Sequence, residues 1–233
     1  MVKLLDEYNN YYNELEQQLI GTLDYVPIDT VNFDTFSIKY NLLYQSICSE
    51  VNVVMKELAK RIAPDKNCDG INSCREIIMG RYPSFTTMKV IGFGLENELC
   101  PWEKWDKNEN PIWWKTYNAV KHDRTGIDTD DNIQNYKLAN QKNVIYALAG
   151  LIVLEWYLLN EYKFTEEEIE SSKKFYAIHE NEAAVEKRKE QLALNLNRHV
   201  LKISNFRHLQ TFFMGYHHFD YKKFKQIVEG IEA

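Results

Sequence analysis

A nearly continuous apolar stretch from residue 144 to residue 159, read VIYALAGLIVLEWYLL, constrains the fold of this chain more than any other feature. The stretch is shorter than the roughly 20 residues that a membrane-spanning helix needs, it contains Glu155, and polar residues flank it on both sides. A helix that is apolar on all faces has to be covered by other elements of the protein. We therefore expect a buried central helix within a helical region from about Tyr136 to Tyr162, and no membrane segment.

The remaining pattern also favours helices. Only 9 glycines and 5 prolines punctuate the 233 residues, so a fold rich in sheets and tight turns is disfavoured. Apolar residues recur at helical spacing in residues 2–22, and again from a cap at Asp34 to about Ile62. A short helix is expected from Asn72 or Ser73 to Arg81, and residues 86–105 are expected to form a small hairpin or an ordered loop.

The composition changes near residue 164. Residues 165–197 are strongly charged with a thin apolar stripe, and the tail from residue 198 to residue 233 is aromatic again. We expect an exposed helix or a partner-binding arm, followed by a tail that docks on the protein. The sequence thus predicts an all-α helical bundle in residues 1–163, with a small irregular or hairpin insertion, and a helical C-terminal extension in residues 164–233.

Charge and cysteine content exclude several classes of protein. The formal net charge of -6 argues against a broad basic surface for duplex DNA, although it permits a local basic pocket. The cysteines lack the CxxC spacing of a zinc ribbon or a redox dithiol, and they do not indicate a secreted disulfide scaffold. The N-terminal residues carry charges where a secretion signal needs an apolar core. We expect a cytoplasmic protein that uses no metal and no cofactor.

Residues 110–124, NPIWWKTYNAVKHDR, gather basic and polar groups on one predicted helix. Asn110 is expected to cap this helix, with Pro111 in its first position. Because residues three, four and seven apart share a face, Lys115, Asn118 and His122 form one stripe. Lys121 lies at the edge of the stripe, and four residues are left mainly to pack: Trp113, Trp114, Tyr117 and Val120. A purely structural reading stays open, because cations at the end of a helix complement its dipole.

Four pieces of the chain together resemble the HEPN superfamily, a group of all-α bundles found in bacterial toxins and phage-defence proteins. They are residues 36–62, Pro-Trp at 101–102, WWKTYNAVKHDR at 113–124, and the Ala/Leu-rich helix that follows. The superfamily motif is an Arg, four to six residues, and then a His, often with Asn directly after the Arg. Asn118 and His122 match this pattern, Tyr117 stands where the Arg would be, and Lys115 is the nearest basic substitute.

The resemblance implies an HEPN-like up-and-down bundle that cleaves RNA without a metal, in a pocket built across a homodimer. It implies a role in host defence or in a toxin–antitoxin pair, with an antitoxin or defence protein as partner. The implied catalytic residues are His122 for proton transfer, Asn118 for orientation, and a fixed cation from Lys115, Lys121 or Arg124. The substrate site would add Trp114 from the same helix, and Glu50 and Lys56 from the second helix, where a solvated surface pair is the alternative for Glu50 and Lys56.

A second class of function stays open because Tyr117 replaces the Arg. The chain would then be a non-catalytic HEPN-like module that binds nucleotide, RNA or a protein, with residues 121–124 in a structural network. The position of His122 distinguishes the two. An open basic cleft at a dimer axis would support catalysis, whereas His122 buried against Glu50 would support a structural role.

Overall fold

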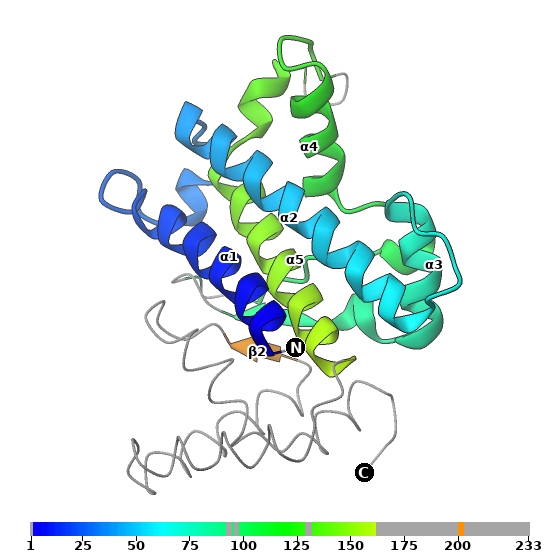
Figure 1. Ribbon diagram of the computed structural model, residues 1–233. Helices are drawn as coiled ribbons and strands as arrows, with labels where there is room; N and C mark the ends of the chain where they lie inside the picture. Colours follow the sequence, from blue (N-terminus) through cyan, green and yellow to red (C-terminus); the bar gives the residue numbers. More distant parts are fainter. Residues whose placement is uncertain (1, 92–94, 96–97, 129–131, 162–199, 203–233) are drawn as a thin grey trace, which may run out of the picture.

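The computed structural model describes residues 2–91, 95, 98–128, 132–161 and 200–202 of the 233-residue chain. These residues are mostly helical, which confirms the all-α prediction at this level. Figure 1 shows how the helices are arranged in space. The α-helices of the described residues are α1 (Val2–Ile20), α2 (Ile38–Ile62), α3 (Ile71–Arg81), α4 (Ile112–His122) and α5 (Gln141–Asn160).

The apolar stretch forms α5, and the other helices cover it. Every residue from 147 to 158 is buried, because α2 packs along one side of α5 while α1 and α4 pack against other parts of it (Figure 1). The prediction of a buried central helix is therefore confirmed. Among the described residues, no helix is both long and apolar enough to cross a membrane.

The starts of α2 and α5 both differ from the prediction, for one shared reason. The cap of α2 is Ser37, whose Oγ accepts a hydrogen bond from the Tyr40 amide at 3.0 Å, and not Asp34. The residues before Ser37 are held extended by an antiparallel bridge between Phe36 and Asn140, so α2 cannot begin earlier. The same bridge precedes α5, which starts at Gln141 after the short 3-10 helix η4 (Asn135–Leu138), and not at Tyr136.

The described residues between 86 and 105 are largely irregular, and Lys89–Ile91 form a short strand. The 3-10 helix η2 (Phe85–Thr87) leads into β1 (Lys89–Ile91), and Val90 forms an isolated antiparallel bridge with Leu99. β1 also pairs in parallel with β2 (Val200–Lys202), so these two strands form a two-stranded sheet. The 3-10 helix η3 (Trp105–Lys107) closes the region, while η1 (Thr30–Asn32) lies between α1 and α2.

The part of the C-terminal extension that the structure describes is β2 alone, so the predicted exposed helix and aromatic tail lie outside the described residues. The division into domains at residues 163 and 164 stays a prediction.

The cysteines correct one expectation. Cys68 and Cys74 form a disulfide with their Cα atoms 5.1 Å apart, although the cysteine spacing did not indicate a disulfide scaffold. The disulfide joins the α2–α3 loop to the first turns of α3. The two cysteines are six residues apart in the sequence, a spacing that is not the CxxC motif. Cys48 and Cys100 are free thiols. Because disulfides persist mainly in oxidising compartments, the cytoplasmic location stays a prediction.

A buried aromatic cluster joins α4 to the centre of the protein. The indole N–H of Trp102 donates to the Gly150 carbonyl of α5 at 3.0 Å, and that of Trp113 donates to the Pro101 carbonyl at 2.7 Å. The Trp102 and Trp113 rings meet edge to face, with centroids 5.2 Å apart. A Cβ atom at Gly150 would lie 2.8 Å from the Trp113 ring, so α4 approaches α5 this closely only because residue 150 is glycine.

Candidate functional site

The helix that carries the predicted site begins one residue later than expected. Pro111 occupies the capping position with extended ψ of 144°, and its carbonyl accepts hydrogen bonds from the Trp114 and Lys115 amides at 2.9 and 3.0 Å. The buried Oδ1 atom of Asn110 has no hydrogen-bond partner among the described residues. The prediction that Asn110 caps the helix was wrong, because Pro111 itself supplies the non-helical backbone that a cap requires.

The side of α4 that was predicted to pack is buried, and it contacts α2. Its buried residues are Trp113, Trp114, Tyr117 and Val120. The Tyr44 hydroxyl of α2 donates to the Trp113 carbonyl and lies 2.8 Å from the Thr116 hydroxyl oxygen. Tyr117, at the position of the motif Arg, packs edge to face against Tyr44 with centroids 6.1 Å apart. These contacts fix the rotation of α4 about its axis.

The opposite side of α4 is open to solvent. Lys115, Lys121, His122 and Arg124 are all exposed, and Asn118 is partly exposed. The Lys121 ammonium lies 5.5 Å from the centroid of the Tyr117 ring, a favourable cation–π arrangement. The structure thus places the five predicted catalytic residues on one helix and the residues directly after it, with His122 as the last residue of α4.

The chain after His122 is held firmly although its side chains are exposed. The Asn135 side-chain amide donates to the Asp123 carbonyl at 2.6 Å, and the Tyr136 amide donates to the Arg124 carbonyl at 3.1 Å. The Asp123 carboxylate accepts a hydrogen bond from the Gly126 amide at 3.0 Å. The backbone of residues 123–126 is therefore attached to η4, which leaves the cationic side chains free to meet a ligand.

The three predicted substrate-binding residues are not part of this exposed group. Trp114 is only 7% exposed, and its ring packs against Trp113 and Tyr117. Glu50 and Lys56 are partly buried on α2. Within the described residues, no hydrogen bond or ion pair joins Glu50 to His122. The charge of Glu50 instead contributes to raising the pKa of Glu155 on α5, after the larger effect of burial on Glu155.

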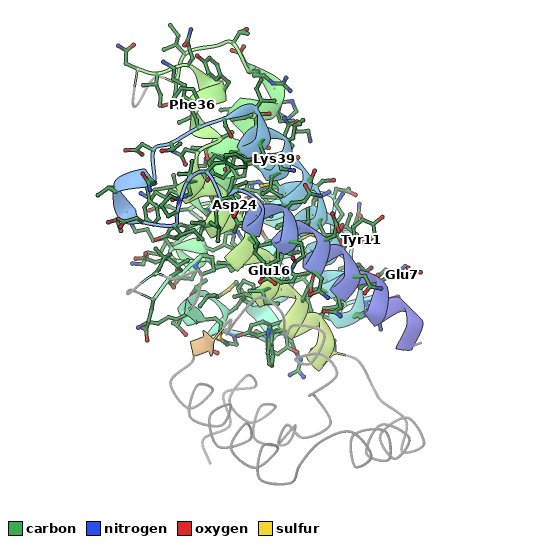
Figure 2. The ribbon with its side chains drawn as sticks, turned by 90° about the vertical axis from the view of Figure 1, so that its left-hand side faces the viewer. Glu7, Tyr11, Glu16, Asp24, Phe36 and Lys39 are labelled. Carbon is green, nitrogen blue, oxygen red and sulfur yellow. A yellow bond between two sulfur atoms is a disulfide. The ribbon has the colours of Figure 1, made fainter. Side chains whose placement is uncertain are left out.

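A buried group of carboxylic acids, which the sequence did not predict, lies between α1, α2 and α5. Glu16 of α1 is fully buried, and the Tyr12 hydroxyl donates to its Oε1 at 3.2 Å. Figure 2 shows Glu16 on the side of α1 that faces the bundle, with Tyr11 on the outer side. Burial raises the pKa of Glu16 to about 8. Glu155 is 2% exposed, and neither of its carboxyl oxygens has a hydrogen-bond partner in the described part of the chain.

The buried carboxyl groups of Glu16 and Glu155 are better suited to stay protonated than to bind a metal ion. Burial disfavours the charged form of each carboxyl group, and every neighbouring carboxylate adds to the cost. No group of three or more His, Cys, Asp or Glu side chains in the described ranges is arranged to hold a metal ion. The signal in the sequence was Glu155 inside the apolar stretch, whereas the electrostatic effect of Glu16 on the Glu155 pKa depends on how α1 packs.

Two rings and a lysine that the sequence did not predict to meet lie beside the end of α4. We call them the Phe36 cluster: Phe36, Tyr136 and Lys137. The two rings meet edge to face with centroids 5.6 Å apart. The Lys137 ammonium lies 5.8 Å from the Phe36 centroid and 5.9 Å from the Tyr136 centroid. The adjacent Tyr136 and Lys137 were visible in the sequence, but Phe36 lies far from them along the chain, and only the fold brings it beside them.

Comparisons with known proteins do not identify a family for this chain. Comparison of the chain with protein-family models, with curated proteins and with solved structures finds no match.

Proposed function

We propose that this protein is an HEPN-like RNA endonuclease that acts without a metal in host defence or in a toxin–antitoxin pair. The observation that carries the proposal is the position of His122. It lies exposed at the end of α4, with Lys121 before it and Arg124 shortly after it, on a helix whose other side is anchored in the core. An open imidazole among cations is an arrangement that suits RNA self-cleavage chemistry.

The reaction uses a nucleophile that the substrate supplies. The ribose 2′-oxygen attacks the adjacent phosphorus while His122 takes the 2′-hydroxyl proton, and the bond from phosphorus to the 5′-oxygen breaks. A proton from a second acid, such as the partner subunit's imidazole or water, completes the departing 5′-hydroxyl. Lys115, Lys121 and Arg124 supply positive charge for the phosphate oxygens, whose negative charge increases in the transition state.

A homodimer would complete such a site. Two copies of α4 across a two-fold axis would bring two imidazoles and two sets of cations to one strand of RNA. Local positive charge would then attract RNA to a chain whose formal net charge is -6. A toxin of this kind would be restrained by an antitoxin or defence protein that covers the open side of α4.

The second candidate is a non-catalytic module of the same fold that binds RNA, nucleotide or a protein. The observation that favours it is Tyr117, which replaces the motif Arg and is packed against Tyr44 and Trp114. In this case the cations of α4 bind phosphate groups, and no bond is broken.

The first experiment is cleavage of total bacterial RNA and transfer RNA in excess chelator. We compare the wild-type protein with His122→Ala, Lys115→Ala and the control Lys66→Ala, which removes an exposed cation from the α2–α3 loop. We expect His122→Ala to slow cleavage by about 10²- to 10⁴-fold. The products should carry 2′,3′-cyclic phosphate and 5′-hydroxyl ends, and a substrate with a 2′-deoxyribose at the cleaved position should resist.

Each outcome separates the candidates. Cleavage that His122→Ala and Lys115→Ala reduce, but Lys66→Ala does not, supports the endonuclease. Cleavage that survives His122→Ala contradicts the assigned chemistry. A folded wild-type protein that binds RNA without cleaving it supports the non-catalytic module.

A further inference from the structure

The Phe36 cluster exposes aromatic side chains to solvent near the end of α4. Phe36 is 42% exposed, and Tyr136 and Lys137 are partly exposed beside it. Figure 2 shows Phe36 and the nearby Lys39 at the beginning of α2. Figure 1 shows the end of α4, the loop after it and the beginning of α2 at the same end of the bundle. Exposed rings among cations are the arrangement that single-stranded nucleic acids use for stacking.

The backbone holds these rings rigidly. Phe36 is bridged to Asn140, the Gln141 amide donates to the Thr35 carbonyl at 2.9 Å, and the Lys142 amide donates to the Phe33 carbonyl at 3.1 Å. Tyr136 is fixed through its amide, which donates to the Arg124 carbonyl. A surface aromatic ring on a fixed backbone loses little conformational freedom when a ligand stacks on it, which favours binding.

The cluster is physically connected to the candidate site. The hydrogen bond from Tyr136 ends on Arg124, only two residues after His122. The Lys137 ammonium lies over both rings, so a base stacked on Phe36 would have a cation beside its phosphate. A purely structural role explains the contact between the rings, but it does not require Phe36 to stay so exposed.

We propose that Phe36, Tyr136 and Lys137 form a stacking site for a base of single-stranded RNA, next to the phosphate-binding cations of α4. Phe36 offers the ring face, Tyr136 supports it from the side, and Lys137 neutralises the phosphate of the stacked nucleotide. This inference rests on the proposed function for the choice of RNA, but it does not need cleavage. It selects unpaired RNA over duplex RNA, whose bases are not free to stack on a protein ring.

The test is the binding of a fluorescent single-stranded oligoribonucleotide to the full chain, measured by anisotropy in chelator. All proteins carry His122→Ala so that the RNA stays intact. Adding Phe36→Ala should weaken binding by roughly 5- to 150-fold, the range for one stacked base. Phe36→Leu keeps apolar contact with Tyr136 but removes the flat ring, so it should weaken binding without a change in melting temperature. Phe36→Trp should restore binding or strengthen it.

Two matched controls and a salt titration complete the test. Tyr25→Ala and Ile38→Ala each remove an exposed apolar side chain outside the cluster and should leave the affinity unchanged. Lys137→Ala should lower the slope of log affinity against log salt by about 0.7, the value for one phosphate contact on a single strand. A hairpin duplex of the same length should bind more weakly than the single strand.

The outcomes separate this inference from the proposed function. If the wild-type protein cleaves RNA while Phe36→Leu binds RNA normally, the stacking site is wrong and the endonuclease stands. If binding depends on Phe36 but the wild-type protein does not cleave, the stacking site stands in a non-catalytic module. If the folded protein binds no RNA, both proposals are wrong.

Discussion

The protein contains two groups of aromatic rings whose surroundings are opposite. The Trp102 and Trp113 rings are buried where α4 meets α5, and their indole N–H groups donate to backbone carbonyls. Phe36 and Tyr136 lie at the surface with an ammonium group over them. The first group stabilises the fold, and the second has surface left for a ligand. Aromatic content alone therefore does not indicate which rings can bind a base, because only burial separates the two groups.

Charge is also divided between the interior and the surface. The interior holds Glu16 and Glu155, whose carboxyl groups are raised in pKa by burial, whereas the end of α4 exposes Lys121, His122 and Arg124. A buried carboxyl group that keeps its proton adds no negative charge to the field outside. The formal charge of -6 thus overstates the repulsion that an approaching RNA experiences.

The largest expected difference between the two regions is in stability. We expect Trp102→Ala to lower the free energy of unfolding by about 3–5 kcal/mol, since it removes a fully buried indole, its ring contacts and its hydrogen bond to Gly150. Phe36→Ala should cost about 1 kcal/mol or less, because much of the ring is already in water. Urea denaturation of both variants measures the difference. Equal losses would show that the Phe36 cluster is part of the core.

The interior acids should make stability depend on pH. Because the pKa of Glu16 rises from 4.5 to about 8 on folding, the native state binds more protons than the unfolded state between these values. The contribution of Glu16 to the free energy of unfolding is therefore highest below about pH 4.5, and it falls as the pH rises towards 8.

Burial raises the pKa of Glu155 in the same way, so Glu155 also lowers stability at high pH. Glu155→Gln removes this ionisable group and should raise stability at pH 8 by an amount on the order of 1–3 kcal/mol, which makes stability less dependent on pH. Urea midpoints measured from pH 5 to pH 8 test this, and a wild-type protein that is more stable at pH 8 contradicts it.

The smallest effect on stability is expected at the end of α4. His122→Ala should change the free energy of unfolding by less than about 0.5 kcal/mol, because the imidazole is exposed and has no hydrogen bond or ion pair within the described residues. Thermal melting followed by circular dichroism provides the measurement, with Trp102→Ala as the destabilised reference. Loss of folding in His122→Ala would assign a structural role to this histidine. The end of α4 would then contribute to stability as the buried Trp102 does.

Much of the fold was predictable because local patterns determined it. The apolar stretch predicted α5, helical spacing predicted α1, α2 and α3, and the stripe on residues 112–122 predicted which side of α4 packs. The helix starts were less predictable. Asp34 and Asn110 are good capping residues, but the bridge at Phe36 and the backbone of Pro111 decided where the helices begin.

By itself, the sequence determined the helical class, the buried central helix and the group of polar and basic residues on α4, since each depends on residues that are close in the chain. Tertiary structure alone decided that Phe36 meets Tyr136, that Cys68 bonds to Cys74, and that Glu16 and Glu155 share one interior. Only tertiary structure, too, separated the buried rings from the exposed ones. Burial, pKa and contact between distant residues depend on how whole helices pack, and no local pattern specifies that packing.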